Sequence, residues 1–318
     1  MRDLCIDARM AFSSGIGTYI RELLPFLQSA FRLILLVDRP WREGCEQILF
    51  NAPIYSVQEQ IQYPFKIPPC DLFWSPHYNV PLLPIRAKKR IVTIHDACHF
   101  VFGSFAEKTY AKWVMGKALQ SHRAITVSQF SKKEIEKRFG PTHLTVIPIG
   151  VNRERFSPQP PSESVRQKMG LPPKFALFVG SHKPHKNLQR LRRVPLKDLE
   201  LVAIGPGIQS VDEKDLPILY SMAEVFVYPS LYEGFGLPPL EAMSCGCPTA
   251  VSSAASIPEV CGDASVYFDP MCEDAMALAI EQARKRTLVA KGFERAGAFD
   301  WQTTAERHIA LFQEALHA

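Results

Sequence analysis

The chain has 318 residues, of which 47% are hydrophobic and 22% are charged, and its formal net charge is +5. These values are typical of a soluble globular protein, and the length favours two domains because single cores rarely grow beyond about 250 to 300 residues. They exclude a membrane-spanning helix, since no apolar stretch approaches the roughly 20 residues that cross a bilayer.

The N-terminus and the cysteines both indicate a cytosolic protein. The first ten residues, MRDLCIDARM, carry acidic side chains where a signal peptide would have a long apolar run. The eight cysteines form no C-x-x-C pair, which favours reduced thiols packed as small apolar side chains and argues against a zinc site. We therefore expect a cytoplasmic protein without structural disulfides or zinc.

Positive charge is concentrated in the first half of the chain. Residues 1–160 carry 21 Lys and Arg against 13 Asp and Glu, a balance of +8, whereas the remainder carries 16 against 19, a balance of −3. Such a surface is either simply solvated or meets an anionic partner. Solvation is the first interpretation, an anionic lipid surface the second, and nucleic acid the last, because no nucleic-acid motif occurs.

The chain begins with a predicted strand over residues 3–7 and an amphipathic helix from about Ile16. Gly15 and Gly17 lie between them, where backbone N–H groups could approach a phosphate. A simple turn into the helix explains this weak G-x-G pattern equally well. Further strands are predicted from Arg32 and over residues 71–76.

The segment RIVTIHD, residues 90–96, predicts a buried strand whose carboxyl end carries His95 and Asp96. A lone histidine at a strand end is more often structural than catalytic. The helical pattern over residues 106–121 carries an apolar face with interspersed lysines, which indicates either core packing or a basic helix that faces lipid. Its lysines are Lys108, Lys112 and Lys117. A strand and a helix capped by Ser128 or Ser131 follow over residues 124–135, and another strand starts at residue 145.

Proline, serine and glutamine at residues 158–161 indicate a linker. The next strand, residues 174–180, leads into SHKPHKNLQRL, whose lysines could neutralise a diphosphate leaving group. A charge run of this kind more often marks a solvated surface. A strand at residues 199–207 and one helix then precede the most informative stretch of the chain.

That stretch, residues 223–251, predicts a buried strand, a glycine loop, a helix and a second strand. Glu233 falls in the loop and Glu241 near the helix start, so both carboxylates should lie at the carboxyl edge of a parallel sheet, where such sheets bind ligands. Carboxylates accept hydrogen bonds from a ribose diol, and the N–H groups of a helix start can hold a diphosphate. Gly234 and Gly236 allow close approach of the backbone.

The segment E-G-F-G-L-P-P-L-E-A-M-S-C-G-C-P resembles the paired-glutamate motif of retaining glycosyltransferase family four, the group 1 glycosyltransferases. The resemblance covers nearly the whole chain. It implies an α/β protein with the GT-B fold, in which two doubly wound Rossmann-like domains face a cleft. The second domain is expected to be shortened, because the strand and helix that the family usually has before the central motif are absent. The expected boundaries are 1–157 for the acceptor-side domain, 158–172 for the linker, 173–298 for the nucleotide-sugar domain and 299–318 for a helix that returns to the first domain.

The resemblance also implies the site residues. Catalytic roles fall on His95, Glu233 and Lys186, the last of which matches the family's phosphate lysine. Donor-binding roles fall on Gly15, Gly17, Lys183, Lys186, Gly234, Phe235, Gly236, Leu237 and Glu241. One departure concerns the arginine that usually accompanies the phosphate lysine: its two common positions hold Ser181 and His185. Lys183 is the candidate substitute, although an ammonium cannot make the bidentate contact of a guanidinium.

The implied reaction is transfer of a hexose, mannose or glucose, from a GDP- or UDP-linked donor to a glycan or lipid-linked acceptor. Because the sequence contains no D-x-D, we expect neither a metal nor another cofactor. Peripheral contact with an anionic membrane on its inner face remains open, and no nucleic acid is expected. The alternatives are a catalytically weak or inactive scaffold that binds nucleotide-sugars, favoured by the missing arginine, and another GT-B enzyme such as an epimerase or phosphorylase.

Overall fold

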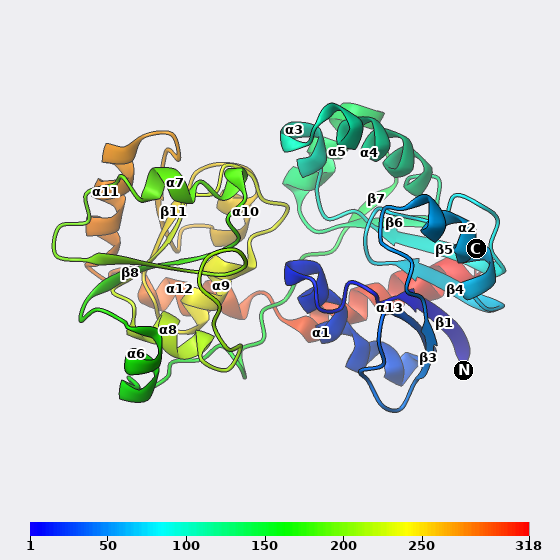
Figure 1. The fold of residues 1–318 in the computed structure, drawn as a ribbon, viewed down its shortest axis with the longest axis horizontal. Coiled ribbons are helices and arrows are strands. Elements are labelled where there is room, and N and C mark those ends of the chain that lie inside the picture. The colour runs from blue at the N-terminus through cyan, green and yellow to red at the C-terminus, as the bar shows by residue number, and fades with distance from the viewer. Residues whose placement is uncertain (318) are drawn as a thin grey trace. The chain divides into compact units, whose positions relative to one another are not determined.

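The computed structural model describes residues 1–317, apart from the side chain of Ser14. It divides into two compact domains, which are described separately (Figure 1). The first domain comprises Met1–Ile149 together with the chain from Trp301 onward, and the second comprises Gly150–Asp300. Both are α/β domains built on one parallel sheet, as the sequence predicts.

The first domain contains a seven-stranded sheet of order β3-β2-β1-β4-β5-β6-β7, in which neighbouring strands are parallel. The strands are β1 (Arg2–Asp7), β2 (Phe31–Val37), β3 (Glu46–Leu49), β4 (Cys70–Ser75), β5 (Ala87–Thr93), β6 (Arg123–Thr126) and β7 (Leu144–Val146). The helices are α1 (Ser14–Ala30), α2 (Val57–Lys66), α3 (Cys98–Phe102), α4 (Phe105–Ala118), α5 (Gln129–Phe139) and α13 (Trp301–His317). The chain order reverses between β1 and β4, so the carboxyl ends of these strands mark the ligand-binding edge of a Rossmann-like sheet.

The second domain contains a five-stranded parallel sheet of order β12-β11-β10-β8-β9. The strands are β8 (Phe175–Val179), β9 (Glu200–Ile204), β10 (Val225–Tyr228), β11 (Thr249–Ser252) and β12 (Val266–Phe268). The helical elements are α6 (Glu163–Met169), the 3₁₀ turn η1 (Pro184–Lys186), α7 (Leu188–Leu191), α8 (Leu216–Met222), α9 (Leu237–Ser244), α10 (Ile257–Cys261), α11 (Glu273–Ala283) and α12 (Val289–Gly297). Here the order reverses between β8 and β10.

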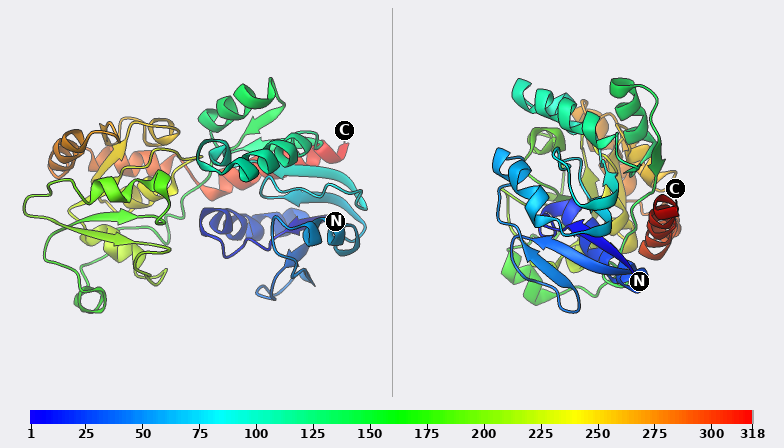
Figure 2. Two further views of the ribbon diagram at one scale, coloured as in Figure 1. Left: turned by 45° about the horizontal axis from the view of Figure 1, so that its top comes forward. Right: turned by 90° about the vertical axis from the view of Figure 1, so that its right-hand side faces the viewer.

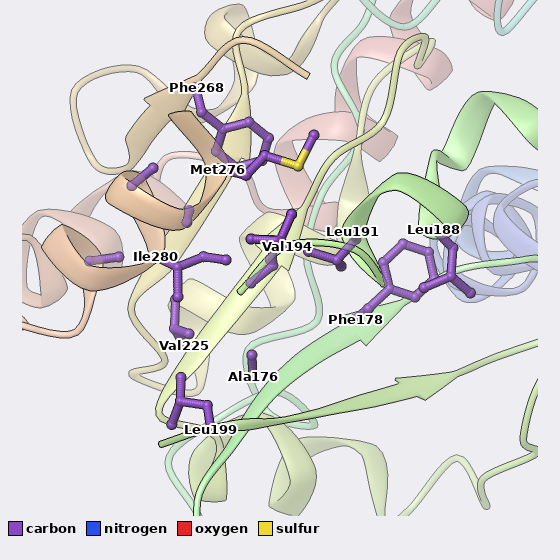
Figure 3. Close-up of a cluster of buried hydrophobic side chains, with 14 residues drawn as sticks. Ala176, Phe178, Leu188, Leu191, Val194, Leu199, Val225, Phe268, Met276 and Ile280 are labelled. Atoms are coloured by element: carbon purple, nitrogen blue, oxygen red, sulfur yellow. The ribbon is translucent and has the colours of Figure 1, made fainter. Parts of the chain in front are cut away.

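The apolar runs form strands because helices cover both faces of each sheet. In the second domain, side chains from β8 and β10 pack with α7 and α11 into one core cluster (Figure 3). Phe178, Val225 and Ile280 in this cluster are essentially inaccessible to solvent. The core therefore fixes the two strands whose carboxyl ends flank the switch point of the sheet.

The last helix, α13, belongs to the first domain and packs against α1 (Figure 2). Trp301 and Phe312 on this helix are buried, and the Thr304 hydroxyl donates a hydrogen bond of 2.9 Å to the carbonyl of Pro148. The C-terminal segment is thus part of the first domain's core although 151 residues of the second domain precede it.

Several local features differ from the sequence predictions. The segment predicted as a linker, residues 158–172, contains α6, because Ser162 caps this helix and Val165 and Met169 are buried. The division between domains falls instead between Ile149 and Gly150. Residues 41–84, for which only the strand at 71–76 was predicted, also contain β3 and α2. The cap of α5 is Ser128, whose hydroxyl accepts from the backbone N–H of Ser131.

The second domain is shortened, as the sequence predicts. Only α8 separates β9 from β10, and the helix after Lys186 ends at Leu191 after a single turn. Within residues 1–317, no helix has both the length and the apolar character needed to cross a bilayer.

Candidate active site

Lys186 and Glu233 form the central pair of the candidate site. Lys186 ends the turn η1 after β8, and Glu233 lies in the loop between β10 and α9. The lysine Nζ lies 2.7 Å from Oε1 and 2.9 Å from Oε2 of Glu233, and 3.2 Å from the hydroxyl of Tyr228. The side chains of Lys186 and Glu233 are 17% and 11% exposed, so the pair is nearly enclosed while one side still meets solvent.

Burial and charge act against each other in this pair. Burial favours the neutral form of Lys186, but the attraction of the Glu233 carboxylate outweighs it and raises the lysine pKa. Burial likewise favours protonated Glu233, but the ammonium lowers the carboxyl pKa below its ordinary value. Both groups are therefore charged at neutral pH. A fixed ammonium at the switch point is suited to stabilise an anion that develops there.

Asn187 holds the lysine in place. Its backbone adopts the left-handed conformation, with φ 58°, and its side-chain amide donates to the carbonyls of Pro229 (3.2 Å) and Pro270 (2.7 Å). The backbone N–H of Leu231 donates to the carbonyl of His185 at 2.7 Å. These contacts tie the turn that carries Lys186 to the ends of β10 and β12.

The loop from Glu233 to Gly236 is fixed from the side of α10. The hydroxyl of Ser256 lies 2.9 Å from the carbonyl oxygen of Glu233 and 2.8 Å from that of Phe235. Phe235 is buried and meets Phe299 edge-on. Gly236 has φ 106°, a conformation that favours glycine at the point where the loop enters α9.

The start of α9 offers fewer donors than a typical helix. Leu237 is its first residue and keeps its N–H, but Pro238 and Pro239 follow and have no N–H group. The prolines fix φ near its helical value. They remove no intrahelical hydrogen bond, because the N–H groups in the first turn of a helix have no partner within the helix. A diphosphate at this end would therefore meet Leu237 and the preceding glycine loop rather than a full first turn.

Glu241 lies on α9, and its Oε2 accepts a hydrogen bond of 3.0 Å from the hydroxyl of Tyr220 on α8. Tyr220 is fully buried, and burial together with this carboxylate raises its pKa, so the phenol keeps its proton and donates. The contact orients the carboxylate through a rigid aromatic group. Lys183, the candidate substitute for the missing arginine, is exposed immediately before η1.

His95 lies just beyond β5 in the first domain and is partly exposed. Its Nε2 is 2.8 Å from the carbonyl oxygen of Pro76. A carbonyl only accepts hydrogen bonds, so Nε2 carries the proton. Burial lowers the pKa of His95, although the Pro76 carbonyl and Asp96 oppose this effect. The ring is thus neutral, with the lone pair on Nδ1.

Gly15 and Gly17 both lie in the first turn of α1. A Cβ on Gly17 would approach the carbonyl oxygen of Ala11 to 2.6 Å, which supplies a structural reason for glycine there. A Cβ on Gly15 would meet nothing within 4 Å, so close packing does not explain that glycine. Packing therefore explains the glycine at position 17 but not the glycine at position 15, although the sequence pattern grouped the two together.

Sequence reasoning missed several residues that shape these sites. Tyr228 and Tyr220 were assigned to an apolar strand and a helix, where nothing in their spacing marks a polar role. A buried cluster at the ends of β1 and β4 was also missed. In it, Arg9 pairs with Asp7 and Glu59, both at 2.6 Å, and Asn79 donates to Glu59 at 2.6 Å. The signal that could have revealed it is the pair of opposite charges, Asp7 and Arg9, at the carboxyl end of a buried strand.

No group of three or more His, Cys, Asp or Glu side chains suited to a metal ion occurs in the described part of the chain. The arrangement is that of two Rossmann-like domains, one with a lysine and two carboxylates at its ligand-binding edge. This combination is the one that the resemblance to the group 1 glycosyltransferases implies for a GT-B enzyme.

Comparison with known proteins identifies the family. Residues 207–297 match the family described as "Glycosyl transferases group 1", and residues 13–155 match "Glycosyltransferase Family 4". The O-antigen chain mannosyltransferase B of Escherichia coli is 32% identical over 73% of this chain and 72% of its own length. The O-antigen chain mannosyltransferase RfbU of Salmonella typhimurium is 27% identical over 72% of this chain and 69% of its own. The chain belongs to glycosyltransferase family four and is a nucleotide-sugar-dependent hexosyltransferase.

Solved structures support the fold independently. Sucrose-phosphate synthase from Thermosynechococcus elongatus superposes with a TM-score of 0.78 at 18% identity and covers 99% of both chains. HepE from Anabaena, in complex with UDP-glucose, gives a TM-score of 0.78 at 15% identity, with 99% of this chain and 100% of that chain covered. The predicted fold class is confirmed, and the scaffold without enzymatic activity is set aside because the matching relatives are enzymes.

Replacing Lys186 with methionine tests the electrostatics of the central pair. In the wild type, the contribution of Glu233 to stability is present above its ordinary pKa of 4.5 and is lost as pH falls through the lowered value. In Lys186→Met the attraction of the ammonium is lost, and burial is opposed only by the neighbouring hydroxyls of Tyr228 and Ser230. We expect burial to outweigh these hydroxyls, so that the Glu233 pKa rises above 4.5 and stability falls with increasing pH. Breaking such a pair should cost about 3 to 5 kcal/mol at neutral pH.

The measurement is a carbon NMR titration of the Glu233 carboxyl group, combined with urea unfolding between acidic and neutral pH. The control is Lys186→Met/Glu233→Gln, which should lack the pH-dependent loss of stability. A Glu233 pKa that stays below 4.5 in Lys186→Met would show that the lysine does not control this carboxylate.

Proposed function

We propose that the protein transfers mannose from a GDP- or UDP-linked donor to a bacterial surface glycan or its lipid-linked precursor. The observation that carries the proposal is the nearly enclosed Lys186–Glu233 pair at the switch point of the second domain. Glu241, on α9 of the same domain, is oriented by Tyr220. The choice of mannose is supported by the relatives, which include the MMP alpha-(1->4)-mannosyltransferase of Mycolicibacterium hassiacum, 31% identical over 229 residues. Glucose is the competing donor sugar.

Each candidate residue receives a role from its chemistry. Glu241 accepts hydrogen bonds from the ribose diol, because an ionised carboxylate only accepts. Gly236, Leu237 and, in the first turn of α1, Gly15 approach the diphosphate through backbone N–H groups. The N–H of Gly17 donates to the carbonyl of Ser13 at 2.8 Å, so Gly17 and Gly234 are assigned only the close approach of the backbone. Lys183 adds a second positive charge near that group. The Phe235 ring, buried against Phe299, keeps the loop rigid.

The reaction then proceeds with retention at the anomeric carbon. The bond between this carbon and the diphosphate oxygen breaks, and the acceptor hydroxyl forms the new bond on the same face. The hydroxyl proton passes to the departing diphosphate. Lys186 stabilises the negative charge that grows on the diphosphate. Glu233 holds Lys186 and accepts from the sugar, and the Nδ1 lone pair of His95 accepts from another sugar hydroxyl.

This division of roles predicts different kinetic effects for two variants. Lys186→Ala should lower kcat by about 100 to 1000-fold, because it removes a group that acts mainly in the transition state. Glu241→Ala should instead raise the donor Kd, at a cost of about 1.5 to 3 kcal/mol, because it removes a charged hydrogen-bond partner of the ground state. Transfer of radiolabelled mannose and glucose to lipid and glycan extracts, together with donor calorimetry, measures both.

The assay is run with and without EDTA, since we propose that the lysines and helix starts balance the phosphate charge without a metal. Activity abolished by EDTA and restored by magnesium would contradict the metal-free mechanism. Near-normal turnover of Lys186→Ala would remove Lys186 from the diphosphate site. Glucose transfer with no mannose transfer would overturn the choice of sugar but leave the site intact.

We also propose that the first domain contacts an anionic membrane. On α4 the aromatic residues Phe105 and Trp113 are 87% and 56% exposed, and Lys112 and Lys117 are exposed beside them. Exposed aromatic rings next to lysines suit the boundary between lipid headgroups and acyl chains. The basic balance of the first half of the chain supports the same partner.

The helix α2 in the same domain also carries exposed apolar side chains. Val57, Ile61 and Phe65 recur every four residues along it and are 77%, 56% and 79% exposed. Tyr55, just before α2, meets Tyr110 of α4 with ring centroids 6.1 Å apart, which links the start of α2 to α4. Both helices thus offer exposed apolar side chains within one domain.

Flotation with acidic liposomes tests the membrane proposal. We expect binding at low salt that weakens as salt is added. Lys112→Gln/Lys117→Gln should bind about 30-fold more weakly, because each lysine near an anionic surface contributes about 1 kcal/mol. The matched control, Lys214→Gln/Lys285→Gln, removes the same charge from the second domain and should bind as the wild type does. Absence of flotation at low salt, or equal loss in the control, would refute the proposal.

A further inference from the structure

Tyr19 connects the candidate catalytic histidine with the last helix of the chain. Its side chain on α1 is fully buried, and its ring meets the His95 ring edge-on, with centroids 4.9 Å apart and an angle of 85° between the planes. The hydroxyl of Tyr19 lies 2.5 Å from Nε2 of His308 on α13. A buried aromatic residue therefore lies against His95 on one side and hydrogen-bonds to α13 on the other.

The direction of each hydrogen bond in this group follows from its neighbours. Nδ1 of His308 lies 2.7 Å from the carbonyl oxygen of Thr304, so Nδ1 carries the proton and Nε2 accepts. The hydroxyl of Tyr19 must then donate to His308. The indole Nε1–H of Trp74 can only donate, and it lies 3.1 Å from the Thr93 hydroxyl. The Thr93 hydroxyl lies 3.1 Å from the hydroxyl of Tyr19. The Thr93 hydroxyl therefore donates to Tyr19.

This chain of bonds runs in one direction, from Trp74 through Thr93 and Tyr19 to His308. Burial lowers the pKa of His308 to about 4, so its Nε2 remains an acceptor at neutral pH. Every polar atom in the chain has a defined role, which fixes the Tyr19 ring in one orientation. The ring of Trp301 on α13 also packs near that of Tyr19, with centroids 6.4 Å apart.

We propose that Tyr19 is a positioning residue for His95, and that His308 on the last helix sets the orientation of Tyr19. The inference rests on the proposed role of His95 in sugar transfer. The Pro76 carbonyl fixes the Nε2 end of the His95 ring, and the Tyr19 ring, packed at 85° to it, limits its rotation. The two contacts together fix the direction of the Nδ1 lone pair of His95. A displacement of a catalytic group by about 1 Å can lower the rate about 100-fold.

The groups around His95 determine how its pKa responds to a substitution at Tyr19. The Pro76 carbonyl, which accepts from the ring, and Asp96 both raise the pKa of His95, whereas His77 beyond β4 lowers it. His308 faces it from α13, and Tyr19 from α1 contributes mainly by excluding water. Removing the Tyr19 ring admits water beside His95 and reduces the burial that lowers its pKa.

The decisive experiment is a nitrogen NMR titration of the His95 ring in the whole protein without donor or acceptor. In Tyr19→Leu we expect the pKa of His95 to rise by about one unit. Tyr19→Phe keeps the ring edge but loses the bond to His308, so we expect a smaller rise. The loss of kcat should follow the same order, with a fall of about 10 to 100-fold in Tyr19→Leu and a smaller fall in Tyr19→Phe. The acidic limb of the pH profile of kcat/KM should move to higher pH in both variants.

The matched control is Phe312→Leu. Phe312 is equally buried on α13 and packs against Trp74 and His308, with centroids 5.4 and 6.0 Å apart. This variant should lose stability without changing the His95 titration. An unchanged His95 pKa in Tyr19→Phe and Tyr19→Leu, or an equal change in Phe312→Leu, would overturn the inference. Should Tyr19→Leu not fold, the comparison of Tyr19→Phe with Phe312→Leu decides by the same criterion.

The titration also separates this inference from the proposed function. A shifted His95 pKa in the Tyr19 variants supports the positioning contact whatever the transfer rate. If, in addition, His95→Ala retains full activity, the role of His95 in transfer fails while the contact between Tyr19 and His95 stands.

Discussion

The second domain depends on keeping two opposite charges together in a nearly enclosed site. Burial by itself disfavours the charged form of both Lys186 and Glu233. Their mutual attraction offsets this penalty, and Asn187 and Ser256 hold the two loops that carry them. The result is an ammonium that is charged, nearly enclosed and already positioned before any substrate arrives. Preorganisation of this kind is what lets a single positive charge stabilise a leaving group effectively.

The sequence predicted the architecture well because the strongest signals in it are local. Buried parallel strands appear as continuous apolar runs, and glycine, serine and proline mark the loops and caps, so the order of elements along the second domain could be anticipated. The short helix α6 inside the predicted linker was missed because proline-rich flanks mask a capped seven-residue helix. The helix α2 escaped notice because its exposed face is apolar and its buried face carries Glu59, the reverse of the usual pattern.

The candidate site residues were found through a motif, and their physical partners were not. The pairing of Lys186 with Glu233 joins residues 47 positions apart, and the bond from Tyr19 to His308 spans 289 positions. No periodicity or spacing encodes contacts over such distances, since they follow from how the sheets order their strands and from where the last helix returns. The buried tyrosines illustrate the same limit, because in a sequence they cannot be told apart from ordinary core aromatics.

The central claim is that the protein transfers mannose with retention at the anomeric carbon. Proton and carbon NMR of the product, formed by the wild-type enzyme from an α-linked nucleotide-mannose donor, tests it directly through the one-bond carbon–hydrogen coupling at the new linkage. The account predicts an α-mannoside as the first product detected. A β-mannoside would contradict it, because an inverted linkage requires attack from the opposite face of the sugar and a separate base for the acceptor hydroxyl.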